Sequence, residues 1–102
     1  MNKVVLMGRL TRDVELRQTA KGVSVARFNI AAHRRFSEKA DFINCIAWGQ
    51  TADFIAKYFK KGNMLSLEGR LESGSYEDKS GSVQYVTEVV AEMVYFCGEA
   101  HK

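Results

Sequence analysis

Residues 41–62, with the sequence DFINCIAWGQTADFIAKYFKKG, form the stretch that decides the fold. Residues 41–48 are rich in aromatic and β-branched side chains, which is typical of a β-strand. Between residues 51–61 the pattern changes, because Phe54 and Tyr58 stand four positions apart. That spacing places apolar side chains on one face of a helix. The stretch therefore predicts a strand that is followed at once by a helix.

Both ends of the predicted helix carry residues that favour them. Thr51 is a suitable N-cap, because its hydroxyl can accept a bond from a free backbone N–H of the first turn. Asp53 is close to the positive end of the helix dipole, and Gly62 can adopt the left-handed backbone that ends many helices. The negative end is matched by three lysines, namely Lys57, Lys60 and Lys61.

Four further segments on either side of this stretch read as strands. They are rich in β-branched and apolar residues and are separated by polar turns; they cover residues 4–10, 23–30, 64–71 and 83–96. Gly8 and Gly69 fall inside two of them and predict the bends or bulges that a small barrel needs. Five strands with one helix between the third and the fourth is the connectivity of an OB-fold. We therefore predict an all-β, five-stranded Greek-key barrel, with residues 1–102 forming a single domain.

The composition is that of an ordinary globular protein. Hydrophobic residues make up 46% of the chain and charged residues 26%, and no apolar run is long enough to span a bilayer. Arg9 interrupts the first apolar stretch, so the N-terminus does not read as a signal peptide. Two cysteines, Cys45 and Cys97, are too few for a disulfide framework and lack metal-ligand spacing. We expect a reducing cytoplasm, no membrane association and no bound metal.

Charge is distributed unevenly along the chain. The formal net charge is +3, but there are nine basic against three acidic residues up to Lys39, and six basic against nine acidic from Ala40 onward. A basic half can be the electrostatic footprint of a phosphate-binding surface. Solvated charge scattered over the surface explains the same distribution equally well.

Alternation along residues 41–48 places two large aromatic side chains on one face of the predicted strand. Phe42 and Trp48 point to that face, whereas Cys45 and Ala47 point to the other and are small enough to line a barrel interior. Exposed aromatic side chains are costly unless something covers them. Two interpretations stay open: burial in a core or subunit interface, or stacking against the bases of a nucleic acid.

Two more aromatic residues lie in sequence that fits a protein core poorly. Phe36 directly follows Arg34 and Arg35, and Tyr76 lies in a predicted loop that is rich in glycine and serine. Aromatic side chains interleaved with basic ones at loop tips favour base stacking over burial.

Residues able to support catalysis are scarce. His33 and His101 have no obvious paired nucleophile, and carboxylate pairs such as Asp13 with Glu15 stand beside basic residues in turn-like sequence. Cys45 reads as a small buried hydrophobe, and no glycine-rich phosphate loop occurs in the sequence. We expect no catalytic residue and no cofactor. A protein-interaction or oligosaccharide-binding module stays open as the alternative, because OB-folds also serve those roles.

Six short motifs occur along nearly the whole chain. They are NKVVLMGRLTRD (2–13), ELR (15–17), GVSVARF (22–28), DFINCIAW (41–48), YFKKG (58–62) and YVTEVVAE (85–92). In these motifs and in their order, the chain resembles the bacterial single-stranded DNA-binding proteins.

This resemblance implies sequence-independent binding and protection of single-stranded DNA during replication, recombination or repair, without catalysis. It also implies a homotetramer around which the DNA wraps, in the bacterial cytoplasm and associated with the nucleoid. The base-stacking positions of the family fall at the four residues that exposure alone singles out, Phe36, Phe42, Trp48 and Tyr76. The basic positions expected to meet phosphate are Arg9, Arg17, Arg34, Arg35, Lys57, Lys61 and Arg70.

The last predicted strand supports the expectation of an assembly. Its two faces both carry apolar side chains, which we expect to bury against a partner subunit. They are Val86, Val90 and Val94 on one face and Val89, Met93 and Tyr95 on the other.

Three features depart from the family pattern. Val14 stands where the family commonly has proline, and the hairpin loop at residues 36–41 is shorter than in many members, so we expect a smaller DNA footprint. The family's long polar tail with its acidic tip, through which members recruit replication and repair enzymes, does not follow residues 99–102. We therefore expect weak recruitment of such enzymes. The sequence fits a trimmed chain as well as a short plasmid, phage or accessory form in a bacterial host.

Overall fold

The computed structural model describes residues 1–97, in which six strands and one helix are found. They are β1 (Val4–Leu10), β2 (Glu15–Gln18), β3 (Ser24–His33), β4 (Ala40–Trp48), α1 (Gly49–Tyr58), β5 (Met64–Glu77) and β6 (Val83–Phe96). The chain end at residues 98–102, on which the expectation about a missing tail rests, lies outside the described residues. Within residues 1–97, no helix is long and apolar enough to cross a membrane.

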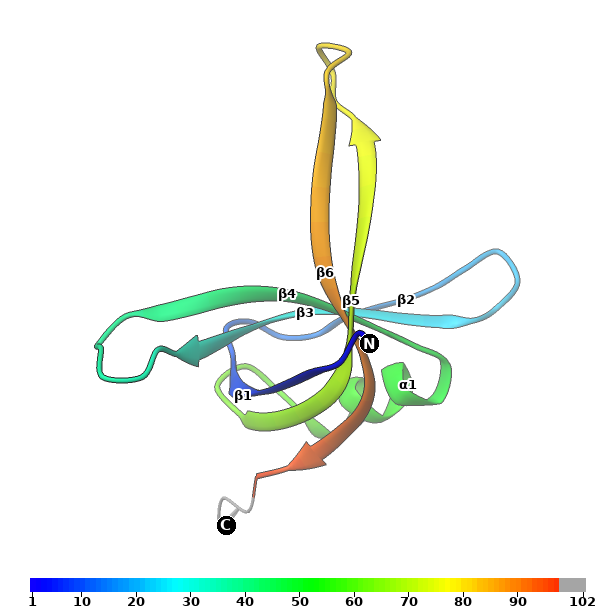
Figure 1. Cartoon of the computed structure of the whole chain (residues 1–102). Helices are drawn as coiled ribbons and strands as arrows, with labels where there is room; N and C mark the ends of the chain where they lie inside the picture. The colour runs from blue at the N-terminus through cyan, green and yellow to red at the C-terminus, as the bar shows by residue number, and fades with distance from the viewer. Residues whose placement is uncertain (98–102) are drawn as a thin grey trace.

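Five of the strands close into a ring. The order is β1-β5-β6-β4-β3, and a short pairing of Arg9 with Ala31 and of Leu10 with Ile30 returns from β1 to β3. β4 and β6 run parallel, whereas the other pairs are antiparallel. With α1 between β4 and β5, this ring is the predicted OB-fold barrel. Figure 1 shows three hairpins extending from it, formed by β2–β3, β3–β4 and β5–β6.

Apolar side chains from every strand of the ring fill the barrel. Cys45 and Ala47 lie in this core, as strand alternation predicts, and α1 contributes Ala52 and Ile55. The other ring strands contribute Leu10, Phe28, Leu67 and Val89, among others. The core thus fixes which face of each strand points outward.

Cys45 illustrates the apolar character of this core. Burial raises the pKa of the Cys45 thiol to about 12, and the negative charge of Glu88 adds to the shift. The thiol therefore stays protonated at neutral pH, and a protonated thiol is a poor nucleophile. The prediction that Cys45 is a small buried hydrophobe is confirmed.

Two glycines lie where backbones approach too closely for a side chain. A Cβ atom at Gly8 would overlap the carbonyl oxygen of Ala31, and one at Gly69 would overlap that of Val90. The register of β5 against β6 also shifts between Glu68 and Gly69. The predicted bend at Gly69 is confirmed, and it lets β5 curve around the barrel before it leaves in the long hairpin.

The predicted bounds of the helix are wrong at both ends. Its N-cap residue is Trp48, which makes no side-chain capping bond, and no acidic residue lies in the first turn. Gly49 has a φ of 63°, and this left-handed backbone turns the chain from β4 into the helix before Thr51 is reached. At the other end, Phe59 already has extended backbone and is 3% exposed. Packing of Phe59 in the core therefore ends the helix before Gly62.

Two strand predictions also need correction. β2 was not predicted, because all four of its residues are exposed and show no apolar alternation. β5 continues to Glu77 instead of ending at residue 71, so Tyr76 lies in a strand and not in a loop. The outer half of the β5–β6 hairpin is exposed on both faces, and its residues pair through the backbone without a buried side. Nothing in its hydrophobic pattern therefore marks it as a strand.

The expectation that both faces of the last strand bury against a partner is wrong in part. Val89 and Val90 are at most 5% exposed within the chain itself, and Val94 packs against its core. Val86, Met93 and Tyr95 are the members of that set that remain exposed. β6 lies between β5 and β4 in the ring, so the residues of β6 that belong to the barrel are buried in the chain's own core.

Candidate nucleic-acid interface

The outer face of β3 and β4 carries two rows in which an arginine and an aromatic side chain flank a smaller residue. In the first row, Trp48 stands opposite Val25, and Val25 stands opposite Arg17 of β2. In the second, Phe42 stands opposite Ala31, and Ala31 stands opposite Arg9 of β1. Side chains of directly opposed residues share a face of the sheet. We call these the Trp48 row (Arg17, Val25, Trp48) and the Phe42 row (Arg9, Ala31, Phe42).

Each row combines a flat ring and a positive charge at a fixed separation. Neighbouring strands are about 4.8 Å apart, so the arginine and the aromatic backbones are separated by about 10 Å. Phe42 is 70% exposed and Trp48 46% exposed, and the residue between each ring and its arginine is small or half-buried. A ring of this kind can stack on a base while the guanidinium reaches a phosphate of the same strand.

Arg17 and Arg9 are placed differently at their ends of the rows. The Arg17 guanidinium lies 3.4 Å from the Glu15 carboxylate, and both side chains are more than half exposed. Such an exposed ion pair is weak and can exchange for a phosphate. The Arg9 guanidinium donates to the carbonyl oxygen of Gly62 at 3.0 Å. That contact brings Arg9 close to the turn that contains Lys61.

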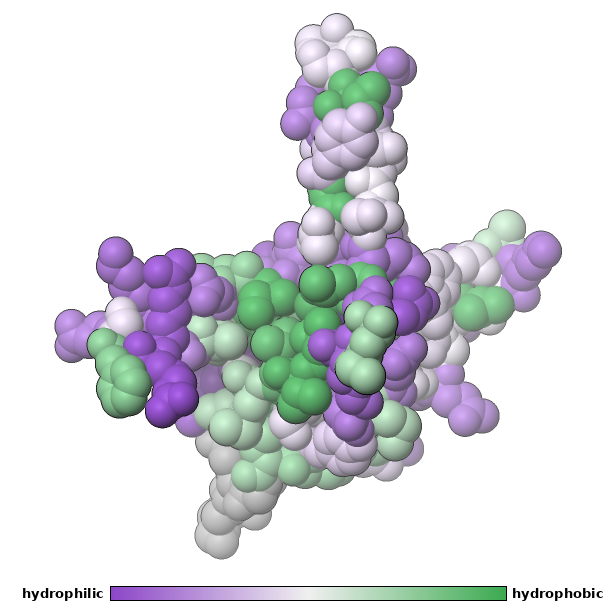
Figure 2. Space-filling model, in the orientation of Figure 1, coloured by the Kyte–Doolittle hydropathy of each residue, from purple (hydrophilic) through white to green (hydrophobic). Residues whose placement is uncertain are grey.

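Phe36 lies at the tip of the β3–β4 hairpin, in the loop where the sequence places it. Its ring is 96% exposed, and its φ of 58° is a left-handed backbone that few non-glycine residues adopt. The Arg35 guanidinium lies 5.0 Å from the centre of the ring. Figure 2 shows hydrophilic side chains around this hairpin tip, on the left of the view. The Phe36 ring is therefore exposed to solvent beside the positive charge of Arg35.

Arg34 closes the base of the same loop. Its guanidinium donates twice to Asp41 Oδ1, at 3.0 and 2.9 Å, and its backbone N–H donates to the Lys39 carbonyl at 3.0 Å. The hydrogen bond to Asp41 raises the pKa of Arg34, with the negative charge of Asp41 adding to the effect. Arg34 is therefore charged, but its charge is already matched by a carboxylate.

Tyr76 lies near the end of the β5–β6 hairpin, on the face that continues the outer face of the barrel. It is 56% exposed and stands opposite Gln84. Arg70 lies on the same face of β5, where it forms ion pairs with Glu72 at 2.8 Å and Glu92 at 3.3 Å. The hydrogen bond to Glu72 raises the pKa of Arg70. This hairpin offers a ring for stacking in an otherwise acidic setting.

Asp78 orders the turn beyond Tyr76. Its Oδ1 atom accepts bonds from the Ser80 hydroxyl at 2.7 Å and from the backbone N–H groups of Ser80 and Ser82 at 2.9 and 3.0 Å. Its Oδ2 atom accepts from Gln84 at 3.0 Å. These bonds lower the pKa of Asp78, and the bond from the Ser80 side chain contributes most. The Tyr76 ring therefore extends from a hairpin with an ordered turn.

The remaining basic residues named by the sequence lie toward α1. Lys57 is in the last turn of α1, and its ammonium group lies 5.2 Å from the centre of the Tyr58 ring. Lys61 follows the helix, and its backbone N–H donates to Asp13 Oδ1 at 2.9 Å. The structure thus brings Lys61 and Arg9 to one end of the barrel and places Lys57 on the helix that covers it.

Sequence reasoning did not single out Tyr85, which is highly exposed. Tyr85 of β6 is 82% exposed, and it stands opposite Ser75, whereas Tyr76 stands opposite Gln84. Adjacent residues of a strand point to opposite faces, so Tyr85 and Tyr76 lie on opposite faces of the hairpin. The polar residues around Tyr85 were a usable signal, but its place in a predicted apolar strand concealed it.

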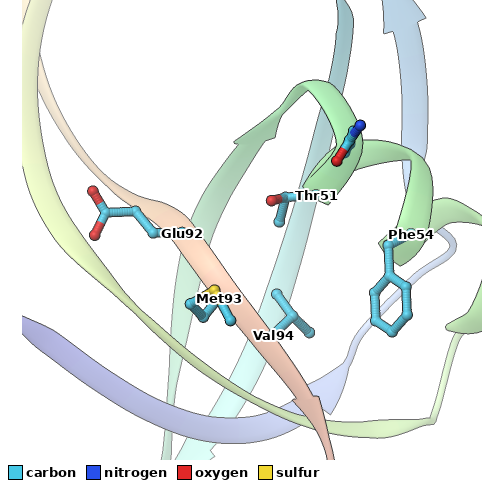
Figure 3. A pocket seen from close by; sticks show the side chains of 6 residues that line it. Thr51, Phe54, Glu92, Met93 and Val94 are labelled. Carbon is cyan, nitrogen blue, oxygen red and sulfur yellow. The ribbon is translucent and has the colours of Figure 1, made fainter.

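A hollow between α1 and β6 lies apart from this outer face. Figure 3 shows Thr51 and Phe54 of α1 on one side of it and Glu92, Met93 and Val94 of β6 on the other. Its volume is about 290 Å³, and none of the six residues that line it is basic. It has no group that would attract a phosphate, so we do not include it in the candidate interface.

Residues 1–97 match the model of the Single-strand binding protein family. The chain is 50% identical over 101 residues to a single-stranded DNA-binding protein of Oceanobacillus iheyensis, a match that covers 94% of this chain and 63% of the relative. It is 51% identical over 98 residues to one of Clostridium perfringens, covering 94% of this chain and 65% of the relative. The chain thus spans less than two thirds of the length of these relatives.

Proposed function

This chain belongs to the single-strand binding protein family, and we propose that it binds and protects unpaired DNA without sequence preference and without catalysis. The single observation that carries the proposal is the pair of rows on the outer face. Each row presents an exposed ring beside an arginine at a separation fixed by the sheet. Every base has a π-face, so a surface of this kind accepts any sequence whose bases are not already paired and stacked.

The proposal ranks the basic residues by their position relative to the exposed rings and, for Arg17, Arg34 and Arg70, by the length of their ion pairs. Arg34 and Arg70 each face carboxylates at short range, so they contribute less to phosphate binding than the sequence alone implies. Arg17 and Arg9 lie in the two rows, and Arg35 lies beside the exposed ring of Phe36. The phosphate path we propose therefore follows Arg17, Arg9, Arg35 and Lys61, with Lys57 at its margin.

The phosphate contact of the Trp48 row can be measured through salt. Binding to a single strand releases counterions, and each phosphate neutralised contributes about 0.7 to the slope of log affinity against log salt concentration. We expect Arg17→Ala to reduce the magnitude of that slope by about 0.7 for a thymidine homopolymer. The slope is obtained by titrating the same oligonucleotide at several salt concentrations.

Lys3→Ala is the matched control for this experiment. It removes one positive charge at the other end of β1 from Arg9, where Lys3 pairs with Glu68 at 3.1 Å. Its slope should equal that of the unchanged protein. If Arg17→Ala and Lys3→Ala shift the slope equally, the effect is one of net charge and the Trp48 row does not hold a phosphate.

We also propose that the chain assembles as a homotetramer through apolar side chains that it leaves exposed. Figure 2 shows apolar side chains gathered near the centre of the view, around β1 and the base of the β5–β6 hairpin. Val5 and Met7 of β1 are 68% and 60% exposed, and Leu71 at the hairpin base is 48% exposed. Met93 and Tyr95 of β6 share a face with Val5 and Met7, because Glu68 pairs with both Val5 and Met93, and Ser66 with both Met7 and Tyr95. These four exposed side chains form an apolar surface that a monomer would leave in water.

Sedimentation at micromolar concentration tests the assembly. We expect a mass near four times that of the 11.5 kDa chain, and a smaller mass for the variant Val5→Glu, whose carboxylate would have to be buried. The fold should survive this change because the Val5 side chain points outward. A monomer for the unchanged protein would contradict the proposal.

The setting we propose is the bacterial cytoplasm, where residues 1–102 act as one DNA-binding domain during replication, recombination or repair.

A further inference from the structure

Three polar side chains form a chain of hydrogen bonds on the outer face, between the Trp48 row and the Phe42 row. The Thr11 hydroxyl donates to Asn29 Oδ1 at 2.8 Å, and Asn29 Nδ2 donates to Asn44 Oδ1 at 2.9 Å. Asn29 and Asn44 stand directly opposite each other on β3 and β4. Thr11 follows β1, and its backbone N–H donates to the Asn29 carbonyl at 3.0 Å. The three side chains make one row across three segments.

The middle member of this chain is buried. Asn29 is only 8% exposed, although asparagine is usually found at the surface. Burying an amide is costly unless hydrogen bonds replace those to water, and here both ends of the amide have a partner. In this network the Thr11 hydroxyl donates to the oxygen end and the nitrogen end donates to Asn44. These two bonds together set the orientation of the Asn29 side chain.

That orientation determines how Asn44 is turned. Asn44 Oδ1 accepts the bond from Asn29, so the Asn44 nitrogen with its two N–H donors points away from Asn29. Within residues 1–97, this nitrogen donates to no protein acceptor. Asn44 is exposed, and it lies two residues from Phe42 on the same face of β4, about 7 Å along the strand. A pair of fixed donors thus stands beside a stacking ring.

A carboxylate near Asn44 does not compete for these donors. Glu88 lines the same hollow of about 230 Å³ as Asn44. Arg27 lies in that hollow too, and its guanidinium donates to Glu88 Oε2 at 2.8 Å. The Glu88 carboxylate is therefore paired with the Arg27 guanidinium. The two N–H donors of Asn44 can then bond to acceptor atoms of a ligand.

We propose that the Asn44 amide is a further DNA-binding group, which donates a hydrogen bond to an acceptor atom of the strand that stacks on Phe42. The proposal rests on the proposed function. The acceptor is a base atom or a phosphate oxygen, because both accept hydrogen bonds from an N–H group. Thr11 and Asn29 are positioning residues, which turn the Asn44 donors outward without contacting DNA. An amide turned the other way would present its oxygen to those acceptors.

The first test removes the donors. A hydrogen bond of this kind contributes about 0.5–1.5 kcal/mol, so Asn44→Ala should weaken binding of a thymidine homopolymer about two- to tenfold. Asn44→Asp is the second variant, since it keeps an oxygen for Asn29 to bond while replacing the outward donors with an oxygen. It should weaken binding at least as much, also at a salt concentration that screens its added charge.

A second ligand identifies the acceptor. It is an oligonucleotide of the same length that carries abasic sugars in place of thymidine. If the acceptor is a base atom, the loss caused by Asn44→Ala appears with thymidine and disappears with the abasic strand. If the acceptor is a phosphate oxygen, the loss is the same with both. Either result supports the proposal and names the acceptor.

The positioning role is tested by a double-mutant cycle. Thr11→Val removes the hydroxyl and keeps the shape of the side chain, so Asn29 and with it Asn44 lose their fixed orientation. We expect Thr11→Val to weaken DNA binding in the unchanged protein and to have no further effect when Asn44 is already alanine. A change that only lowered stability would weaken binding equally in both backgrounds, and urea unfolding of all four proteins checks this.

The outcomes separate this proposal from the proposed function. If the unchanged protein does not bind the thymidine homopolymer, the proposed function itself fails. If it binds, and both Asn44→Ala and Asn44→Asp bind as tightly as it does, the Asn44 amide is not a DNA-binding group. If Thr11→Val has the same effect with and without Asn44, Thr11 does not position the amide.

Discussion

Replacing Tyr76 with alanine is expected to weaken binding of single-stranded DNA by a factor of about five to more than one hundred. Base stacking on an aromatic side chain is typically worth about 1–3 kcal/mol, and about 1.4 kcal/mol corresponds to a tenfold change in affinity. Tyr76 is more than half exposed on a hairpin whose two faces are both solvated, so its removal leaves the core intact. Phe36→Ala should behave in the same way, because the Phe36 ring is 96% exposed. Both affinities are measured by titration at one fixed salt concentration.

Tyr58→Ala is the control for these two variants. The Tyr58 ring packs against Phe54 and Phe96, with ring centres 5.0 and 6.1 Å apart, at the end of the molecule that α1 covers. The Tyr58 side chain is 49% exposed, so its loss should lower the free energy of unfolding modestly, and it should weaken DNA binding far less than Tyr76→Ala does. If Tyr76→Ala and Phe36→Ala bind normally while they remain folded, the stacking assignment is wrong and the basic residues carry the affinity alone.

Much of the fold could be predicted because most elements bury one face. The strands of the ring alternate between core and surface, and that alternation is visible in the sequence as Cys45 and Ala47 against Phe42 and Trp48. β2 and the outer half of β5 bury neither face, so they leave no such pattern. The helix bounds were missed for another reason. They depend on the backbone at Gly49 and on the packing of Phe59, which are tertiary effects.

The candidate site could be predicted in its residue types but not in its arrangement. Exposed rings beside arginines were visible along the chain, whereas the two rows depend on the register of four strands, β1 to β4. Register is set by which faces are buried and by the turns between the strands. The pairing of Arg34 with Asp41 likewise depends on the hairpin that brings them together. Local sequence therefore gives no sign that the charge of Arg34 is matched by a carboxylate.

The burial and the hydrogen-bond partners of the Asn29 amide could not be predicted from the sequence. An asparagine in an apolar strand gives no sign that it is buried, nor that it is held between a threonine and a second asparagine. Its partners are 18 and 15 residues away along the chain. Only the strand register brings Thr11, Asn29 and Asn44 into one row, and with them the direction in which the Asn44 donors point.

Trp48 offers the most direct test that the outer face binds unpaired DNA. It is the only tryptophan, so its emission reports on the Trp48 row alone. We expect a thymidine homopolymer to quench this emission up to a plateau that gives the number of nucleotides bound, because a base then stacks on or beside the ring. A duplex of equal length should cause little change, since its bases are already stacked on one another. Unchanged emission with the single strand at saturation, or equal quenching by the duplex, would contradict the account.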